Sequence, residues 1–158
     1  MIISANKSGL VELKTKKASV LFNDQIRIND VDLEGAGEYE IGEISVQGIE
    51  DYLYILNSED LTIGVIDYKC KISEEQTEAL SDADVLIIRI NGEVKEAVEQ
   101  VNRIEPKVAI YLGDEKSKTR LQETGIDFDS TDQIKLTKSD LELEGKSYFM
   151  QLNNGEHI

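Results

Sequence analysis

The chain has 158 residues with 40% hydrophobic content, which is enough for one domain with a substantial core. Its formal net charge of -15 at pH 7 repels phosphate backbones and anionic lipids, so we expect neither nucleic acid nor a membrane as a partner. The excess acid favours a role in keeping the protein soluble or an adaptation to a high-salt cytosol, and a specific basic partner is the alternative. No run approaches the ~18 apolar residues that a membrane span needs. Residues 1–7 lack the pattern of a secretory signal, so we expect a cytoplasmic location.

The first half of the chain, residues 1–60, is predicted to be rich in β-strands. Short apolar segments alternate with turn residues at regular spacing, which favours antiparallel hairpins in one sheet. These segments are 9–13, 18–22, 25–28, 39–41 and 43–46. Residues 52–56 and 61–66 are predicted to form a further pair of strands, joined by a turn at 57–60.

The second half, residues 61–152, is predicted to be a βαβαβ unit with closing strands. Residues 85–90 and 108–112 are almost wholly apolar, as parallel strands covered on both faces are. An apolar stripe between Val94 and Ile104 recurs at helical spacing, and Pro106 ends that helix. The sequence Ser73-Glu74-Glu75-Gln76 predicts a capping box at the start of the other helix.

The closing part of the chain is more polar. Residues 115–124 suit a short solvated helix ended by Gly125 at its C′ position, and 126–133 suit a loop or a short edge segment. Residues 134–136 and 148–152 alternate like two final strands, with a turn near Gly145. Roughly ten strands favour two packed sheets with helices outside, in one domain spanning residues 1–158.

Three positions are candidates for a functional site. Asp67 ends an apolar strand at the carboxyl edge, where open α/β sheets bind ligands; the alternative is a turn-forming role. Gly113 and Asp114 end the last parallel strand at the same edge, where Asp114 could instead cap a helix. Glu38 follows a glycine pair and could equally belong to a turn entering a strand.

Histidine and cysteine are too scarce for the usual zinc chemistry. Zinc sites draw on three or four His, Cys or carboxylate ligands, whereas this chain holds one histidine, His157, and one cysteine, Cys70. Cys70 lies between two lysines but lacks a neighbouring base, so we expect no catalytic role for it. The chain also lacks the glycine-rich motifs of nucleotide sites and the GxSxG motif of esterases. We therefore expect no catalytic residue, no metal ligand and no cofactor.

Two segments resemble the metallo-β-lactamase superfamily, in the branch of small zinc-dependent hydrolases akin to ascorbate-6-phosphate lactonases. The first reads GEYEI from Gly37, followed by ISVQGI from Ile44. The second runs from Ile66 to Leu112 and is similar to a sequence of turn, LSEEQ-like helix, apolar strand, helix ending in NxIxPK, and strand. Residues 136–152 resemble the closing strands of that branch. The resemblance implies a shortened αββα sandwich.

The same resemblance argues against the activity usual in that family. The HxHxDH loop, which supplies most zinc ligands in relatives, has no counterpart, and the chain passes from Phe22 to Gly35 by a short hairpin. Asp67 matches the metal-bridging aspartate, and Gly113 stands where the last histidine ligand would be. One retained ligand cannot hold a metal, and without a metal no hydroxide nucleophile forms near neutral pH.

The leading hypothesis is therefore a non-catalytic protein of this fold that works through protein contacts or self-association as a homodimer. A second hypothesis is a hydrolase in which Asp67, Asp114 and Glu38 hold Mg²⁺ or Mn²⁺. A third is a small-molecule binding module in the degenerate pocket, lined by Tyr68, Tyr111 and Tyr39.

Overall fold

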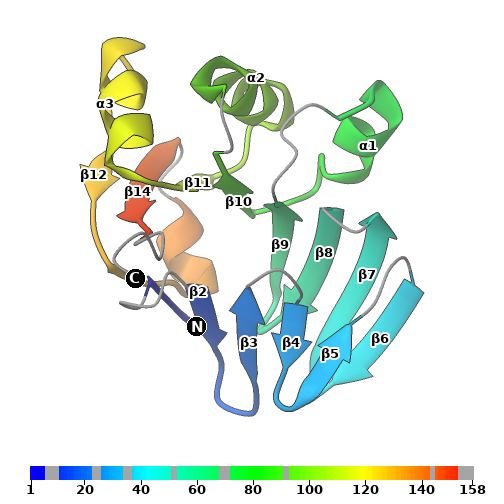
Figure 1. Ribbon diagram of the computed structural model, residues 1–158. Helices are drawn as coiled ribbons and strands as arrows, with labels where there is room; N and C mark the ends of the chain where they lie inside the picture. Colours follow the sequence, from blue (N-terminus) through cyan, green and yellow to red (C-terminus); the bar gives the residue numbers. More distant parts are fainter. Residues whose placement is uncertain are drawn as a thin grey trace.

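The computed structural model describes residues 1–5, 11–22, 26–33, 37–50, 53–67, 72–90, 93–142 and 145–152. Its strands form two sheets packed face to face, and its α-helices lie on the outer side of one of them (Figure 1). The described chain is thus mixed α/β with two sheets, as the sequence predicts.

The first sheet contains six described strands in the order β13-β1-β2-β3-β4-β5, and every neighbouring pair is antiparallel. The strands are β1 (Ile2–Ala5), β2 (Val11–Lys14), β3 (Ser19–Phe22), β4 (Ile26–Ile28), β5 (Val31–Leu33) and β13 (Gln133–Lys135).

The second sheet contains eight described strands in the order β12-β14-β11-β10-β9-β8-β7-β6. Strands β6 to β9 pair antiparallel, whereas β9, β10, β11, β14 and β12 pair parallel. The strands are β6 (Gly37–Ile41), β7 (Ile44–Glu50), β8 (Leu53–Ser58), β9 (Leu61–Ile66), β10 (Val85–Arg89), β11 (Val108–Gly113), β12 (Asp129–Ser130) and β14 (Lys146–Gln151). The helices are α1 (Glu74–Ala79), α2 (Val94–Ile104), α3 (Glu115–Glu123) and the 3₁₀ helix η1 (Lys138–Glu142).

The predicted single sheet of N-terminal hairpins is wrong, because the structure divides these segments between two sheets. Strands β2, β3 and β4 belong to the first sheet, whereas β6 and β7 belong to the second. Each set has one apolar face, and folding the first set over the second buries both faces together. Strands β1 and β5 were not predicted, since each is short and holds only one fully buried side chain, Ile3 and Leu33 respectively.

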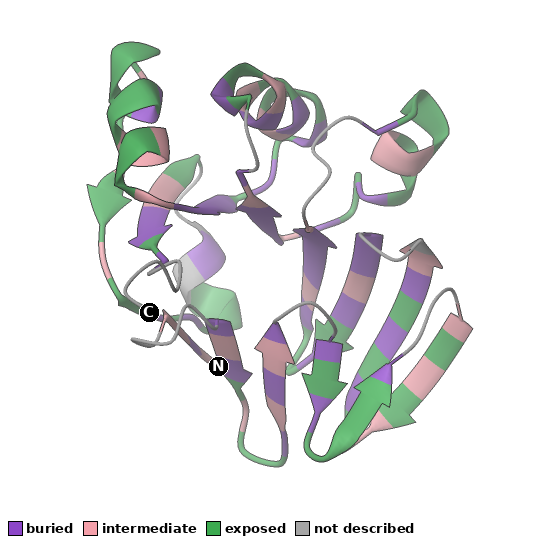
Figure 2. Cartoon of the chain, viewed as in Figure 1, coloured by how far each residue is buried: buried purple, intermediate pink, exposed green. Residues whose placement is uncertain are grey.

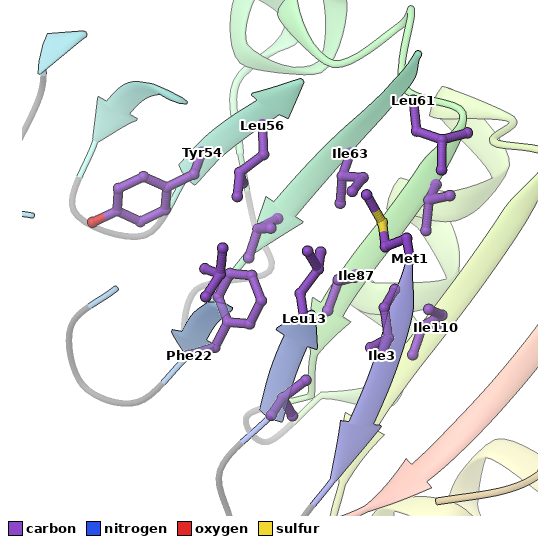
Figure 3. Packing of buried hydrophobic residues seen from close by; sticks show 14 of the residues in the cluster. Met1, Ile3, Leu13, Phe22, Tyr54, Leu56, Leu61, Ile63, Ile87 and Ile110 are labelled. Atoms are coloured by element: carbon purple, nitrogen blue, oxygen red, sulfur yellow. The ribbon is translucent and has the colours of Figure 1, made fainter. Parts of the chain in front are cut away.

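The main core lies between the two sheets. Ile3, Leu13 and Phe22 of the first sheet point toward Leu56, Ile63, Ile87 and Ile110 of the second (Figure 3). All of these side chains are at most 3% exposed, so this layer supplies most of the apolar burial that stabilises the fold.

A second core lies between the larger sheet and the helices. Leu86 and Ile88 of β10, and Ala109 and Tyr111 of β11, face this layer, while alternate residues of the same strands face the first sheet. Both strands are thus buried on both faces, as their apolar runs predict. Helices α2 and α3 turn their buried residues toward the sheet and their exposed residues outward (Figure 2).

The predicted helix signals are confirmed. Ser73 accepts a hydrogen bond from the Gln76 amide, and the Gln76 side chain accepts one from the Ser73 amide, so the capping box is formed. Helix α2 ends at Ile104, since the α region is disfavoured for the residue before Pro106, and Glu105 takes a left-handed conformation. Gly125 has a φ of 84° just after α3, and the final strands form as β13 and β14.

The outer face of the first sheet is largely polar and at least partly exposed. It carries charged and amide side chains at alternate positions: Lys14, Arg27, Asp32, Gln133 and Lys135. An αββα sandwich would have a helical layer on this face too, and the described residues contribute none there. The described layers are therefore one helical layer and two sheets.

Candidate functional site

The carboxyl ends of β9, β10 and β11 meet at one edge of the larger sheet, as the candidate site requires. The pairs Ile66–Ile88 and Arg89–Leu112 place the three strand ends at nearly the same level. Asp67 therefore lies beside the end of β10, and Gly113 lies one strand further along. The structure brings these residues to a common edge, where ligands bind in open α/β sheets.

Asp67 forms an ion pair with Arg89, the last residue of β10. Arg89 Nε lies 3.0 Å from Asp67 Oδ1, and the two side chains are only 24% and 13% exposed. Arg89 shares its side of β10 with Val85 and Ile87, which belong to the core between the sheets. The guanidinium thus compensates the charge of the one carboxylate that matches a metal ligand of the family.

Gly113 and Asp114 have evident structural roles. A Cβ at Gly113 would lie 2.9 Å from Ser117 Cβ, so the close approach of β11 to the first turn of α3 requires glycine here. Asp114 is the N-cap of α3, and its Oδ1 accepts a hydrogen bond of 2.8 Å from the Ser117 amide. This hydrogen bond lowers the pKa of the Asp114 carboxyl from its ordinary value of 3.8. The helix-capping interpretation of this turn is confirmed.

Glu38 lies far from the edge that holds Asp67. It is exposed on β6, which is separated from β9 by two intervening strands, so the strands alone set them about 14 Å apart at ~4.8 Å per step. The register places Glu38 level with Gly64, and Asp67 lies about 10 Å further along β9. Asp67, Asp114 and Glu38 do not converge, which removes the predicted carboxylate centre for Mg²⁺ or Mn²⁺.

The tyrosines of the predicted pocket do not line one cavity. Tyr111 is fully buried in the core under the helices, and this burial raises its pKa to about 12. Tyr39 packs on the opposite face of the same sheet, against the core between the sheets. Tyr68 lies outside the described residues, as do Cys70 and His157. The prediction that Tyr39 and Tyr111 share a pocket is therefore wrong.

A zinc ion, which the resemblance implies for hydrolases, does not fit the described residues of this edge. Within the described ranges, no three His, Cys, Asp or Glu side chains lie close enough to hold one metal ion. The one matching carboxylate is already paired with a guanidinium. A hollow of about 740 Å³ lies instead at the opposite edge of β11 and β14, beside Pro106, Lys107 and Lys146.

Neither the protein-family models nor the curated proteins contain a match for this chain. The resemblance to the metallo-β-lactamase superfamily therefore stays a prediction carried by the motifs themselves. No helix in the described part of the chain is both long and apolar enough to cross a membrane.

Arg89 is the residue of this edge that sequence reasoning missed. In the sequence, Arg89 stands inside the apolar run 85–90, which hides its charge. A lone charge at the end of a strand buried on both faces must find a partner, because an unpaired buried charge is very costly. The neighbouring parallel strand ends in Asp67, so the same pattern that placed the strands could have indicated this pair.

Proposed function

We propose that this chain is a non-catalytic protein with a shortened metallo-β-lactamase-like fold, which acts through contacts with other proteins or with a second copy of itself. The observation that carries the proposal is the ion pair between Asp67 and Arg89. A carboxylate available for a metal needs its charge free, whereas here an internal cation compensates it in a largely buried setting.

The other residues of the edge support the same proposal. Gly113 and Asp114 are explained by the turn into α3, with glycine needed for the close approach and aspartate for the cap. Neither requires a ligand or a reaction to account for its presence. In this proposal the protein therefore acts through its surface and not through the residues of this edge.

Metal analysis tests the non-catalytic part of the proposal. We expect purified protein, dialysed against Zn²⁺, Mg²⁺ or Mn²⁺ and then desalted, to retain far less than one metal ion per chain. The Asp67→Ala variant should give the same result, because Asp67 serves Arg89 and not a metal. Stoichiometric metal in the unaltered protein that disappears in Asp67→Ala would overturn the proposal in favour of a metal-dependent hydrolase.

Light scattering tests the self-association part. A dimer at micromolar concentration would support contacts between copies. A monomer would count against self-association and restrict the proposal to contacts with other proteins. The alternative of a small-molecule binding module predicts a rise in melting temperature with some ligand of a metabolite panel, since a ligand that binds only the folded state stabilises it. Failure of every ligand to raise the melting temperature would count against that alternative.

A further inference from the structure

Among the described strands, β6 forms an open edge of the larger sheet. It stands last in the strand order, and β7 is its partner among the described strands. Unpaired N–H and C=O groups along such an edge are ready to pair with another chain. The register of β6 against β7 decides which residues of β6 offer these groups.

The turn between β6 and β7 determines which backbone groups of β6 point away from β7. Ile41 and Ile44 flank a two-residue loop, and both loop residues, Gly42 and Glu43, have positive φ, at 57° and 64°, as a type I′ turn requires. In such a hairpin the flanking pair is hydrogen-bonded, and hydrogen-bonded and non-hydrogen-bonded pairs then alternate along the ladder. The backbone groups of residues 37, 39 and 41 therefore point toward β7. Those of Glu38 and Glu40 point away from it, toward solvent.

The side chains of β6 alternate in the same way. Glu38 and Glu40 are exposed on the outer face of the sheet, at a surface hollow of about 430 Å³ that Gln47 and Asn57 also line. On the other face, Tyr39 and Ile41 are only partly buried against the core between the sheets. Figure 2 shows this alternation of exposed and half-buried positions along β6. An added strand would meet carboxylates on one face and incompletely covered apolar surface on the other.

We propose that β6 is a docking edge for an extended segment of a partner protein in which basic and apolar residues alternate. This inference rests on the proposed function and names the partner's chemistry. The backbone of the segment pairs with the outward N–H and C=O groups of Glu38 and Glu40. Its Lys or Arg side chains face the two carboxylates, and its apolar side chains cover Tyr39 and Ile41.

A second copy of this chain is a poor occupant of this edge. Antiparallel pairing of two β6 strands about residue 38, 39 or 40 always sets one glutamate opposite another. Like charges directly opposite destabilise a strand pair, and each chain already carries a net charge of -15. Within the described residues, neither Glu38 nor Glu40 forms an ion pair, so both carboxylates are available to a cationic partner.

Fluorescence anisotropy with a labelled peptide of alternating Lys and Val tests the proposal. A peptide of the same composition with its lysines and valines in two blocks, and a peptide of alternating Glu and Val, serve as controls. We expect the alternating Lys-Val peptide to bind most tightly, because a strand places its alternate side chains on opposite faces. Equal binding of the block peptide would overturn the alternation argument.

Variants of β6 separate backbone pairing from charge attraction. Glu40→Pro removes an outward N–H and leaves the β6–β7 ladder intact, because proline is tolerated where an edge N–H faces solvent. Glu40→Gln removes only the charge. We expect Glu40→Pro to bind the peptide at least about fivefold more weakly than Glu40→Gln, as the loss of one backbone hydrogen bond implies. Equal binding would mean that the peptide does not add a strand.

A charge-reversal pair tests the location. Glu38→Lys with Glu40→Lys should weaken binding about tenfold, by turning two cross-strand attractions into repulsions. The matched control, Glu99→Lys with Glu123→Lys, makes the same change of net charge at exposed positions of α2 and α3 and should cost less than about threefold. Equal weakening by both pairs would show attraction to overall charge, not to β6.

Hydrogen exchange of the unaltered protein gives a readout that does not depend on any variant folding. The peptide should protect the amides of Glu38 and Glu40, whereas the amides of Tyr39 and Ile41 are already held by β7. Unchanged exchange at both glutamates under saturating peptide would overturn the docking edge. That result would not affect the proposed loss of metal chemistry, which the metal analysis of the Asp67 edge tests separately.

Discussion

Replacing Arg89 with methionine should reveal how strongly the carboxyl edge depends on its internal cation. Removing one partner of a fully buried ion pair costs about 3–5 kcal/mol, because the other charge stays buried without compensation. Arg89 and Asp67 are 24% and 13% exposed, so solvent relieves part of this cost. We expect Arg89→Met to lower the free energy of unfolding by about 2–3 kcal/mol. For a chain of this size the melting temperature should fall by roughly 4–12 °C.

A double-mutant cycle isolates the interaction from the other effects of each substitution. Asp67→Asn alone should cost about 2 kcal/mol, and the double variant should cost at least about 1 kcal/mol less than the sum of the two single variants. Urea unfolding, fitted for both midpoint and slope, measures each value. Additivity within about 0.3 kcal/mol would refute the reasoning, since it would mean that the two charges do not compensate each other.

The exposed pair Arg27–Asp32 is a matched control within the same chain. Its Nε and Oδ1 atoms are 2.8 Å apart, but the side chains are 50% and 43% exposed. The same cycle, with Arg27→Met and Asp32→Asn, should give a clearly smaller coupling than the cycle of Arg89 and Asp67, because water screens exposed charges. Raising the salt concentration should weaken this coupling more than that of Arg89 and Asp67, because buried pairs are screened less.

Three further substitutions test the structural interpretation of the larger sheet and its helices. Gly113→Ala should cost about 1–3 kcal/mol in urea unfolding, because the new Cβ would lie 2.9 Å from that of Ser117, and a neutral result would show that α3 can shift. Asp114→Ala should cost about 1 kcal/mol at pH 7 through loss of the α3 cap. The folded pKa of Asp114 is lowered, so its contribution is present above the ordinary pKa and fades as pH falls below ~4; a cost that persists at pH 2 would contradict this. Burial raises the pKa of Tyr111 to about 12, so its contribution is present below pH ~10 and is lost as pH rises toward that value. Tyr111→Phe should therefore lose less stability than the unaltered protein between pH 9 and 11, and equal losses would contradict the burial argument.

The elements that the sequence predicted best are those specified by local patterns. The apolar runs became β10 and β11, and the stripe from Val94 to Ile104 became α2 with the same bounds. The Ser73 capping box formed as its spacing predicts. In each case neighbouring residues carry the whole signal, through side-chain period, capping chemistry or the restriction that proline places on the preceding residue.

The division of the early strands between two sheets could not be predicted in this way. Alternation tells which residues of a strand are buried, but it is the same whichever sheet the strand joins. The partner of β1 on one side is β13, with Ile3 opposite Ile134, so the pairing joins opposite ends of the sequence. Such non-local pairings depend on how whole apolar faces cover one another, which no short window of the sequence contains.

The sequence predicts the sheet edge that holds Asp67 but does not predict the ion pair of Asp67 with Arg89. Asp67 alone leaves open whether a metal or a turn accounts for it, and Arg89 supplies a third explanation, a charge partner. A divalent cation bound to Asp67 would have to displace the guanidinium and leave that charge in a largely buried setting. A single carboxylate completed by water ligands offers little to offset such a cost, since stable sites for hard cations gather several oxygen ligands. The ion pair of Asp67 with Arg89 thus opposes metal binding at this edge, and surfaces such as β6 are the better candidates for function.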